Sequence, residues 1–161
     1  MKYIQIGKIV NTHALKGEVR LISNFEFKSR IFIPGKKLYI GISKNEEEIE
    51  SYRVHKNFDM IKFKGIDYIN DVLKYKGNLV YINEEDLILD ENEILISDFI
   101  LYNVYNNGNL IGKITEYRCD NGNKVIRVND KFIPYNKDFI TKIDKENHII
   151  YMHDIEVFLW K

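Results

Sequence analysis

The side chains best suited to chemistry gather in one short stretch near the amino terminus. Its candidate contact residues are Thr12, His13, Leu15, Lys16, Gly17 and Arg20. An imidazole, an ammonium and a guanidinium can donate hydrogen bonds to phosphate, and an imidazole can also stack on a base. His13 alternatively only hydrogen-bonds to its own turn. Residue types alone leave both interpretations open.

The rest of the sequence offers no persuasive catalytic arrangement. It contains no glycine-rich phosphate-binding loop and no His-Glu-x-x-His motif. The four histidines, His13, His55, His148 and His153, are scattered along the chain, and Cys119 is the only cysteine. A cysteine metal cluster and an internal disulfide are therefore excluded. We predict that the protein has no metal and no cofactor and is not an enzyme.

Composition indicates an ordinary globular protein of mainly β structure. The chain has 161 residues, of which 45% are hydrophobic and 30% charged. Ile, Tyr, Phe and Val are frequent and Ala is rare, which favours pleated sheets over helices. The first strand pattern begins within a residue or two of the start, and no apolar run is long enough to span a membrane. We expect a cytoplasmic protein without a membrane partner.

The net charge is zero, but the charges are unevenly distributed. Residues 1–40 hold eight Lys and Arg against two Glu, whereas residues 41–100 hold seven against fourteen Asp and Glu. A basic end can attract nucleic acid, although two solvated faces explain the same asymmetry. Within the basic end, Lys28 and Arg30 lie among Phe side chains and are possible RNA contacts.

Alternating apolar residues predict six short strands in the first half of the chain. They fall at residues 2–10, 17–22, 37–42, 51–55, 60–63 and 79–82. Residues 66–77 break the alternation and predict one short helix, while Glu46 to Glu48 are expected in a solvated loop. Six short strands and one helix describe an antiparallel β-barrel over residues 1–83.

The second half predicts another small β-barrel. Residues 84–93 contain six acids and no base, so we place an acidic linker at residues 84–97. Asn-Gly turns at 107–108 and 121–122 separate alternating apolar runs, which is a strong hairpin signal. The second barrel is expected over residues 98–161, and the spacing of Ile155, Phe158 and Leu159 predicts a short helical turn at the carboxyl end.

The stretch Gly7–Arg20, Gly-Lys-Ile-Val-Asn-Thr-His-Ala-Leu-Lys-Gly-Glu-Val-Arg, resembles the amino-terminal signature of the ribosome maturation factor RimM family. Further similar segments follow in the family's order, at residues 63–67, 73–77, 81–82, 85–87, 98–99, 110–114, 132–135, 138–140 and 143–144. The later ones resemble the family's carboxy-terminal PRC-barrel domain. The resemblance covers nearly the whole chain.

The resemblance implies a non-enzymatic assembly factor for the small (30S) ribosomal subunit. Its implied partners are the nineteenth protein of the small-subunit series, which lies in the subunit head, and the immature 30S subunit with its 16S rRNA; the factor itself is expected to be a monomer. The loop Thr12 to Gly17 with Arg20 would face the subunit. Ile94 and Leu95 occupy the place of an aromatic pair implicated in subunit binding.

Two departures from the family pattern lie at turns. Ala14 stands where the family usually has Gly, so a positive φ at this residue would strain the loop. Lys124 stands at a position that is often acidic.

Two other function classes remain open at this point. One is an RNA-modifying or RNA-cleaving β-barrel enzyme in which His13 acts as acid or base. The other is a purely structural protein-interaction module. RNA turnover that depends on His13 distinguishes the first from an assembly factor, and an unchanged profile of ribosomal subunits in cells lacking the gene distinguishes the second.

Overall fold

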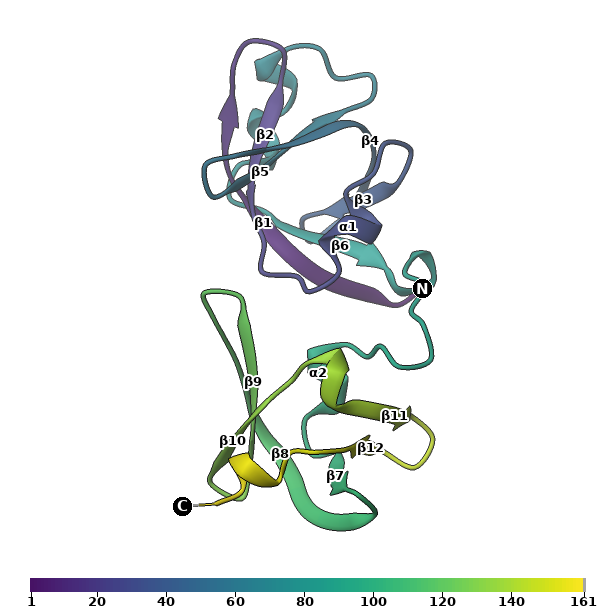
Figure 1. Cartoon of the computed structure of the whole chain (residues 1–161). Helices are drawn as coiled ribbons and strands as arrows, with labels where there is room; N and C mark the ends of the chain where they lie inside the picture. Colours follow the sequence, from purple (N-terminus) through teal and green to yellow (C-terminus); the bar gives the residue numbers. More distant parts are fainter. Residues whose placement is uncertain (161) are drawn as a thin grey trace. The chain divides into compact units, whose positions relative to one another are not determined.

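A computed structural model describes residues 1–160 of the chain. The chain divides into two compact units, unit 1 from Met1 to Ile88 and unit 2 from Leu89 onward. Figure 1 shows unit 1 in purple to teal and unit 2 in teal-green to yellow. The division falls inside the stretch predicted as a linker.

Unit 1 is a closed barrel of six strands, as the alternation predicted. The strands are β1 (Tyr3–His13), β2 (Glu18–Ile22), β3 (Lys37–Ile40), β4 (Asn45–His55), β5 (Phe58–Phe63) and β6 (Leu79–Asn83), and their order around the barrel is β1-β2-β5-β4-β3-β6. Every neighbouring pair is antiparallel. Closure removes the unpaired edges that an open sheet would expose.

Inward-facing residues of all six strands fill the barrel. The buried apolar side chains include Ile9, Val19, Leu21, Leu38, Ile49, Ile61, Phe63, Val80 and Ile82. Strand β1 serves two partners, because β6 pairs with its first half and β2 with its second. Its register shifts between Gln5 and Gly7 and again between Ile9 and Asn11, and such irregularities bend a strand.

Two local predictions for unit 1 need correction. The predicted helix over residues 66–77 is two 3₁₀ turns, η1 (Ile69–Asp71) and η2 (Leu73–Tyr75). The buried residues Val72 and Tyr75 are three apart, and a repeat of three matches the 3₁₀ helix, whereas Leu73 is exposed. The segment therefore covers the barrel with the tighter helix. A four-residue α-helix, α1 (Lys28–Ile31), precedes it in the chain.

The second correction concerns Glu46 to Glu48, which lie in strand β4 and not in a loop. The Glu46 carboxylate lies 3.2 Å from Lys37 Nζ on the neighbouring strand, and Glu48 lies 3.6 Å from Lys64 Nζ. Glu47 accepts a hydrogen bond from the Tyr75 hydroxyl. Partners on β3, after β5 and in η2 thus allow three successive acids in a strand.

Unit 2 is a six-stranded sheet in the order β10-β9-β8-β7-β12-β11. The strands are β7 (Asn103–Asn106), β8 (Asn109–Asp120), β9 (Asn123–Val128), β10 (Lys131–Pro134), β11 (Ile140–Asp144) and β12 (Ile149–Met152). Strands β7 and β12 are parallel, and the other neighbouring pairs are antiparallel. Its core includes Phe99, Val104, Ile114, Ile126, Val128, Ile133, Ile150 and Ile155.

The predicted Asn-Gly turns of unit 2 are confirmed. Asn107 and Gly108 join β7 to β8, and Asn121 and Gly122 join β8 to β9, all with positive φ. This backbone geometry matches the twist of the flanking strands. Short helices complete the unit: α2 (Ile96–Phe99), η4 (Lys137–Phe139) and the predicted carboxy-terminal turn η5 (Glu156–Phe158). Within residues 1–160, the helices are all too short to span a membrane.

Residues 84–97 are attached to the units at both ends. A 3₁₀ turn, η3 (Glu84–Asp86), leads to Leu87, which packs against the core of unit 1. Asn92 accepts a hydrogen bond from the Ile143 backbone N–H at 3.0 Å, and Ile94 belongs to the core of unit 2. The domain boundaries given for this stretch stay a prediction.

Replacing Gly17 with Ala should destabilise the protein more than replacing Gly65 with Ala. Both glycines have positive φ, +85° and +83°, but only at Gly17 would a Cβ meet another atom closely, the Tyr68 carbonyl oxygen at 2.9 Å. We expect Gly17→Ala to lower the free energy of unfolding by about 2–4 kcal/mol and Gly65→Ala by about 1–2 kcal/mol. Urea unfolding followed by circular dichroism measures both. Equal losses would show that the contact with Tyr68 adds nothing.

Candidate functional site

The candidate stretch near the amino terminus forms the tip of the β1–β2 hairpin. Thr12 pairs with Val19, and His13 pairs with Glu18, so the connecting turn is residues 14–17. Ala14 has a φ of 62°, the left-handed conformation that favours glycine. The Leu15 side chain is 81% exposed, and Lys16 is also exposed. The tip therefore displays one apolar and one cationic side chain.

A segment far along the chain supports this turn. The Ile69 backbone N–H donates a hydrogen bond to the Leu15 carbonyl at 3.0 Å. Gly17 is buried against the Tyr68 backbone, and the absence of a side chain allows this approach. The Tyr68 side chain is exposed on the supporting segment. Residues 68–69 thus hold the tip in place, while the side chains of Leu15 and Tyr68 are exposed on adjoining segments.

His13 and Arg20, both candidate contact residues, lie in direct contact. Arg20 Nη2 lies 2.8 Å from His13 Nδ1. Because a guanidinium has only donors, His13 Nδ1 must accept, and the ring proton then resides on Nε2. The Arg20 guanidinium carbon also lies 5.0 Å from the centre of the Phe58 ring, within cation–π range. Arg20 is therefore held between two rings.

Residues of the β4–β5 turn complete this group. The His55 ring centre lies 5.8 Å from that of His13. Burial lowers the pKa of His55, and the positive charges of Arg53 and Lys56, with His13 and Arg20, lower it further. We call His13, Arg20, Arg53, His55, Lys56 and Phe58 the His–Arg cluster.

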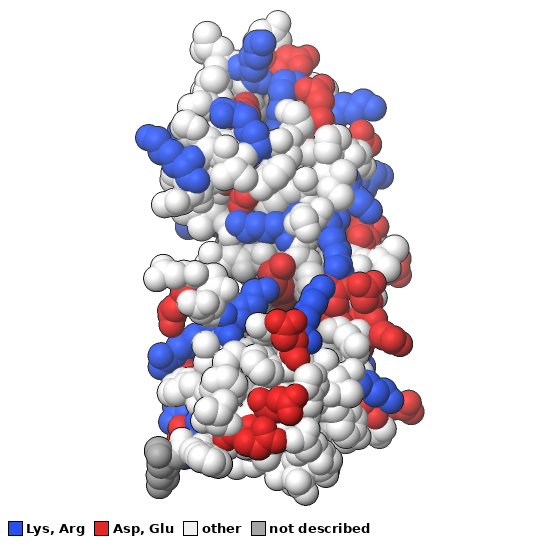
Figure 2. All heavy atoms as spheres, viewed as in Figure 1, with Lys and Arg blue, Asp and Glu red and all other residues white. Residues whose placement is uncertain are grey.

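One carboxylate enters the His–Arg cluster from its edge. Glu18 accepts two hydrogen bonds from Arg53, at 2.9 and 2.7 Å, and this pairing raises the pKa of Arg53. Within the described part of the chain, Lys16 and Lys56 form no ion pair. Glu18 therefore neutralises the charge of Arg53, and Lys16 and Lys56 keep theirs. On unit 1, Figure 2 shows separate basic side chains among uncharged and acidic ones.

Sequence reasoning found two of the six residues of this cluster. It singled out His13 and Arg20 but assigned no role to Arg53, Lys56 or Phe58, and it treated His55 as an isolated histidine. The missed residues meet the others because β5 lies between β2 and β4 in the barrel. A basic turn between two predicted strands was the available signal.

Lys28 and Arg30 have partners within the protein. Lys28 Nζ lies 2.8 Å from the carboxylate of Asp59, which is only 3% exposed and also accepts a hydrogen bond from the Tyr52 hydroxyl at 2.5 Å. Arg30 lies over the Phe27 ring at 5.2 Å and donates to the Ile88 carbonyl at 3.3 Å. RNA contact by Lys28 and Arg30 stays a prediction.

Ile94 and Leu95 are buried, with 6% and 7% of their surface exposed. Ile94 packs in the core of unit 2. A partner would reach these side chains only through a local opening of that unit. Subunit contact by this pair stays a prediction.

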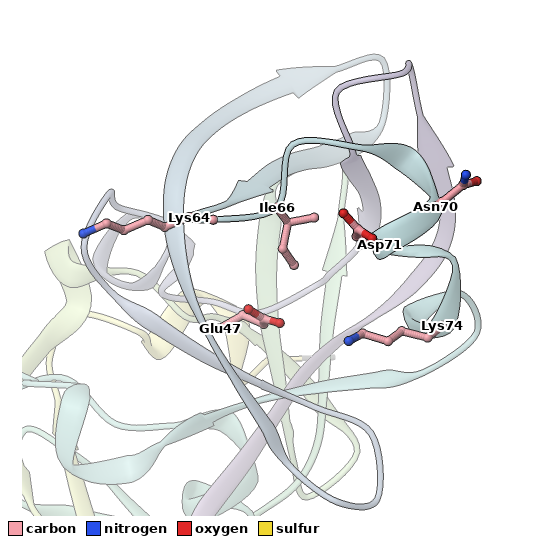
Figure 3. A pocket seen from close by; sticks show the side chains of 7 residues that line it. Glu47, Lys64, Ile66, Asn70, Asp71 and Lys74 are labelled. Carbon is pink, nitrogen blue, oxygen red and sulfur yellow. The ribbon is translucent and has the colours of Figure 1, made fainter.

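A shallow hollow of about 470 Å³ lies beside the supporting segment in unit 1. It is lined by Glu47, Lys64, Gly65, Ile66, Asn70, Asp71 and Lys74, and Figure 3 shows Lys64 and Asn70 pointing away from its centre. Glu47 is occupied by the Tyr75 hydroxyl, whose pKa is raised by burial and by this bond. No group of three His, Cys, Asp or Glu side chains among residues 1–160 is placed to hold a metal ion.

Removing Lys28 should destabilise unit 1. In Lys28→Ala the buried Asp59 carboxylate keeps only its hydrogen bond from Tyr52. Because Lys28 is itself about one-third exposed, we expect a loss of about 1–3 kcal/mol in unfolding free energy. Urea unfolding measures it, and exposed Lys76→Ala serves as the control, with a change within about 0.5 kcal/mol. Adding Asp59→Asn to Lys28→Ala removes the unpaired charge and should recover part of the lost unfolding free energy. If the double variant is no more stable than Lys28→Ala, loss of the ion pair does not explain the destabilisation.

His55 should make stability depend on pH. Its pKa is lower in the folded protein than in the unfolded chain, so the unfolded chain takes up the proton first as pH falls. Stability therefore declines as pH falls below about 6.5, the ordinary histidine value. Thermal unfolding between neutral and mildly acidic pH measures this decline. His55→Gln should flatten the curve, while Lys76→Gln at an exposed position of unit 1 should keep the wild-type slope; identical slopes in both variants would contradict the assignment.

Comparison with known proteins agrees with the resemblance in the sequence. Residues 4–87 match the family model described as the RimM N-terminal domain. The chain is 41% identical over 164 residues to the ribosome maturation factor RimM of Staphylococcus haemolyticus, with 97% of this chain and 98% of that protein covered. It is 38% identical over 169 residues to the ribosome maturation factor RimM of Geobacillus thermodenitrificans, covering 98% and 97%.

A solved structure is also similar. The crystal structure of a 16S ribosomal RNA processing protein RimM from Pseudomonas aeruginosa matches with a TM-score of 0.45 and 19% identity, covering 98% of this chain and 100% of that one. The family model spans most of unit 1, and the curated relatives extend over both units. This chain belongs to the RimM family.

Proposed function

We propose that the protein is a maturation factor of the small (30S) ribosomal subunit that acts by binding and not by catalysis. The observation that carries this proposal is the β1–β2 tip, where Leu15 and Lys16 are displayed on a turn fastened to residues 68–69. A rigid turn loses little conformational entropy when it binds, so its exposed side chains suit recognition. The relatives at 41% and 38% identity are named ribosome maturation factors.

The partners we propose are the nineteenth protein of the small-subunit series, in the subunit head, and the immature subunit with its 16S rRNA. Leu15 and Tyr68 offer an apolar contact suited to a protein surface. Lys16, on the same turn as Leu15, and the His–Arg cluster, which includes Arg20 of β2, offer cations. We propose that the protein acts in the cytoplasm as a monomer.

Binding fits His13 better than acid–base catalysis does. Its Nδ1 is engaged by Arg20, and its ring faces His55. A catalytic histidine needs the reacting group within hydrogen-bond reach. The contacts of His13 instead hold Arg20 in position, which suits a binding surface.

Leu15 should contribute to binding of the immature subunit. Immature small subunits purified from cells lacking the gene are sedimented with the full chain over a range of protein concentrations. We expect the wild type to co-sediment and Leu15→Ser to bind roughly tenfold more weakly, because a polar side chain no longer fills an apolar contact. The matched control is Ile42→Ser, because Ile42 is fully exposed in the β3–β4 turn. This variant should bind like the wild type.

Failure of the wild type to co-sediment would overturn the proposal. Incubation with precursor 16S rRNA tests the enzymatic alternative. Cleavage or modification that disappears in His13→Ala would replace a binding factor with an RNA-processing enzyme.

A further inference from the structure

We propose that the His–Arg cluster is a phosphodiester site that holds a segment of RNA backbone. This inference rests on the proposed function and names the chemical class of ligand at one part of its surface. The cluster joins two hairpin turns, because His13 precedes the β1–β2 turn and His55 precedes the β4–β5 turn, and their ring centres are 5.8 Å apart. Lys16 and Lys56 extend the cationic surface along the two turns.

Arg20 is the fixed centre of the site. The His13 ring and the Phe58 ring hold its guanidinium, at 2.8 Å through a hydrogen bond and at 5.0 Å over the ring. Its Nε is buried and has no hydrogen-bond partner within residues 1–160. No carboxylate contacts Arg20 in the described part of the chain. A positioned guanidinium without a carboxylate is suited to recognise phosphate oxygens.

The groups around Arg20 also carry more positive than negative charge. His55 is faced by His13 from β1, Arg20 from β2, Arg53 from β4 and Lys56 from the β4–β5 turn. Glu18, on β2, is the acid of this group, and both of its oxygens are bonded to Arg53. Crowded positive charge also lowers the pKa of His55, an effect that a bound anion would reverse. The site therefore gains from an incoming negative charge.

The distribution of the cations favours nucleic acid over an acidic protein side chain. They lie on two turns as well as in the cluster between them. A nucleic-acid backbone carries one phosphate per nucleotide and can neutralise several separated cations, whereas one carboxylate neutralises one. One strand of nucleic acid can therefore neutralise an exposed lysine at each turn together with the positioned Arg20.

The test measures binding of the full chain to a short, unstructured single-stranded RNA over a series of salt concentrations. Removal of two phosphate contacts in the double variant Arg20→Gln, Lys56→Gln should reduce the slope of log K against log salt by about 1.4, or about 0.7 per contact. At low salt the affinity should fall roughly tenfold or more. The matched control Lys113→Gln, Arg118→Gln removes the same charge from β8 of unit 2 and should keep the wild-type slope.

A second measurement follows the His55 ring by NMR as pH is varied, with and without the RNA. A phosphate beside the ring favours the protonated form, so the pKa of His55 should rise when RNA binds. Arg20→Lys keeps the charge but loses the planar fork, and it should retain most of the salt slope with weaker affinity. Circular dichroism of each variant verifies folding before the comparison.

An unchanged salt slope in the double variant, or an unchanged His55 pKa on RNA binding, would overturn the phosphodiester site. Sedimentation of the same variants with immature subunits separates this failure from failure of the proposed function. If the double variant loses subunit binding but binds the free RNA like the wild type, the cluster takes an acidic protein group and the assembly function stands. If wild type binds RNA but not the immature subunit, the phosphodiester site stands and the assembly function is wrong.

Discussion

The contact between Gly17 and the Tyr68 backbone is the constraint on which the position of the β1–β2 tip depends. It joins the tip of the first hairpin to a segment fifty residues later, and the bond from the Ile69 N–H to the Leu15 carbonyl fastens the same two segments. That segment continues into η1 and η2, and Val72 between them and Tyr75 of η2 enter the barrel core. The position of the exposed tip is thus set by the core, and a change in the packing of η1 and η2 would be transmitted to the tip.

Charge is used in two different ways within unit 1. Asp59 is buried and satisfied by Lys28 and Tyr52, so these charges tie α1 to the barrel. In the His–Arg cluster the cations outnumber their acidic partners and lie near two turns. Burial with compensation stabilises a fold, whereas partly exposed charge without compensation gives an attraction for ligands.

The sequence predicted those features that depend on neighbouring residues. Alternation along each strand indicated six strands in unit 1, and the Asn-Gly pairs indicated two hairpin turns of unit 2, because both signals are local. The 3₁₀ turns were missed because residues 66–77 also carry apolar side chains at α-helical spacing. Only the packing of Val72 and Tyr75, with Leu73 left exposed, distinguishes the two helix types.

The candidate site was predicted less completely, for a physical reason. The meeting of His13 with His55 requires the barrel order β2-β5-β4, and the pairing of Lys28 with Asp59 joins residues 31 apart. Such contacts follow from topology, which strand periodicity does not specify. Ala14, in contrast, shows a feature that the sequence did indicate. The resemblance implied glycine at this position, which raised a positive φ as a source of strain, and Ala14 has a φ of 62°.

Zero net charge has a consequence for how such a surface selects its partner. A strongly basic protein binds nucleic acid wherever phosphates are available, since counterion release is independent of sequence. In this chain the cations near the first hairpin are balanced elsewhere by acids such as those of residues 84–93, so long-range attraction to RNA is weak. Under the proposed function, Leu15 and Tyr68 require a protein surface while the His–Arg cluster requires phosphate beside it. Two modest contacts on neighbouring segments of one barrel bind well only where protein and RNA adjoin, because the second contact then forms at high effective concentration. An immature subunit offers that junction, and free RNA or free protein offers only half of it.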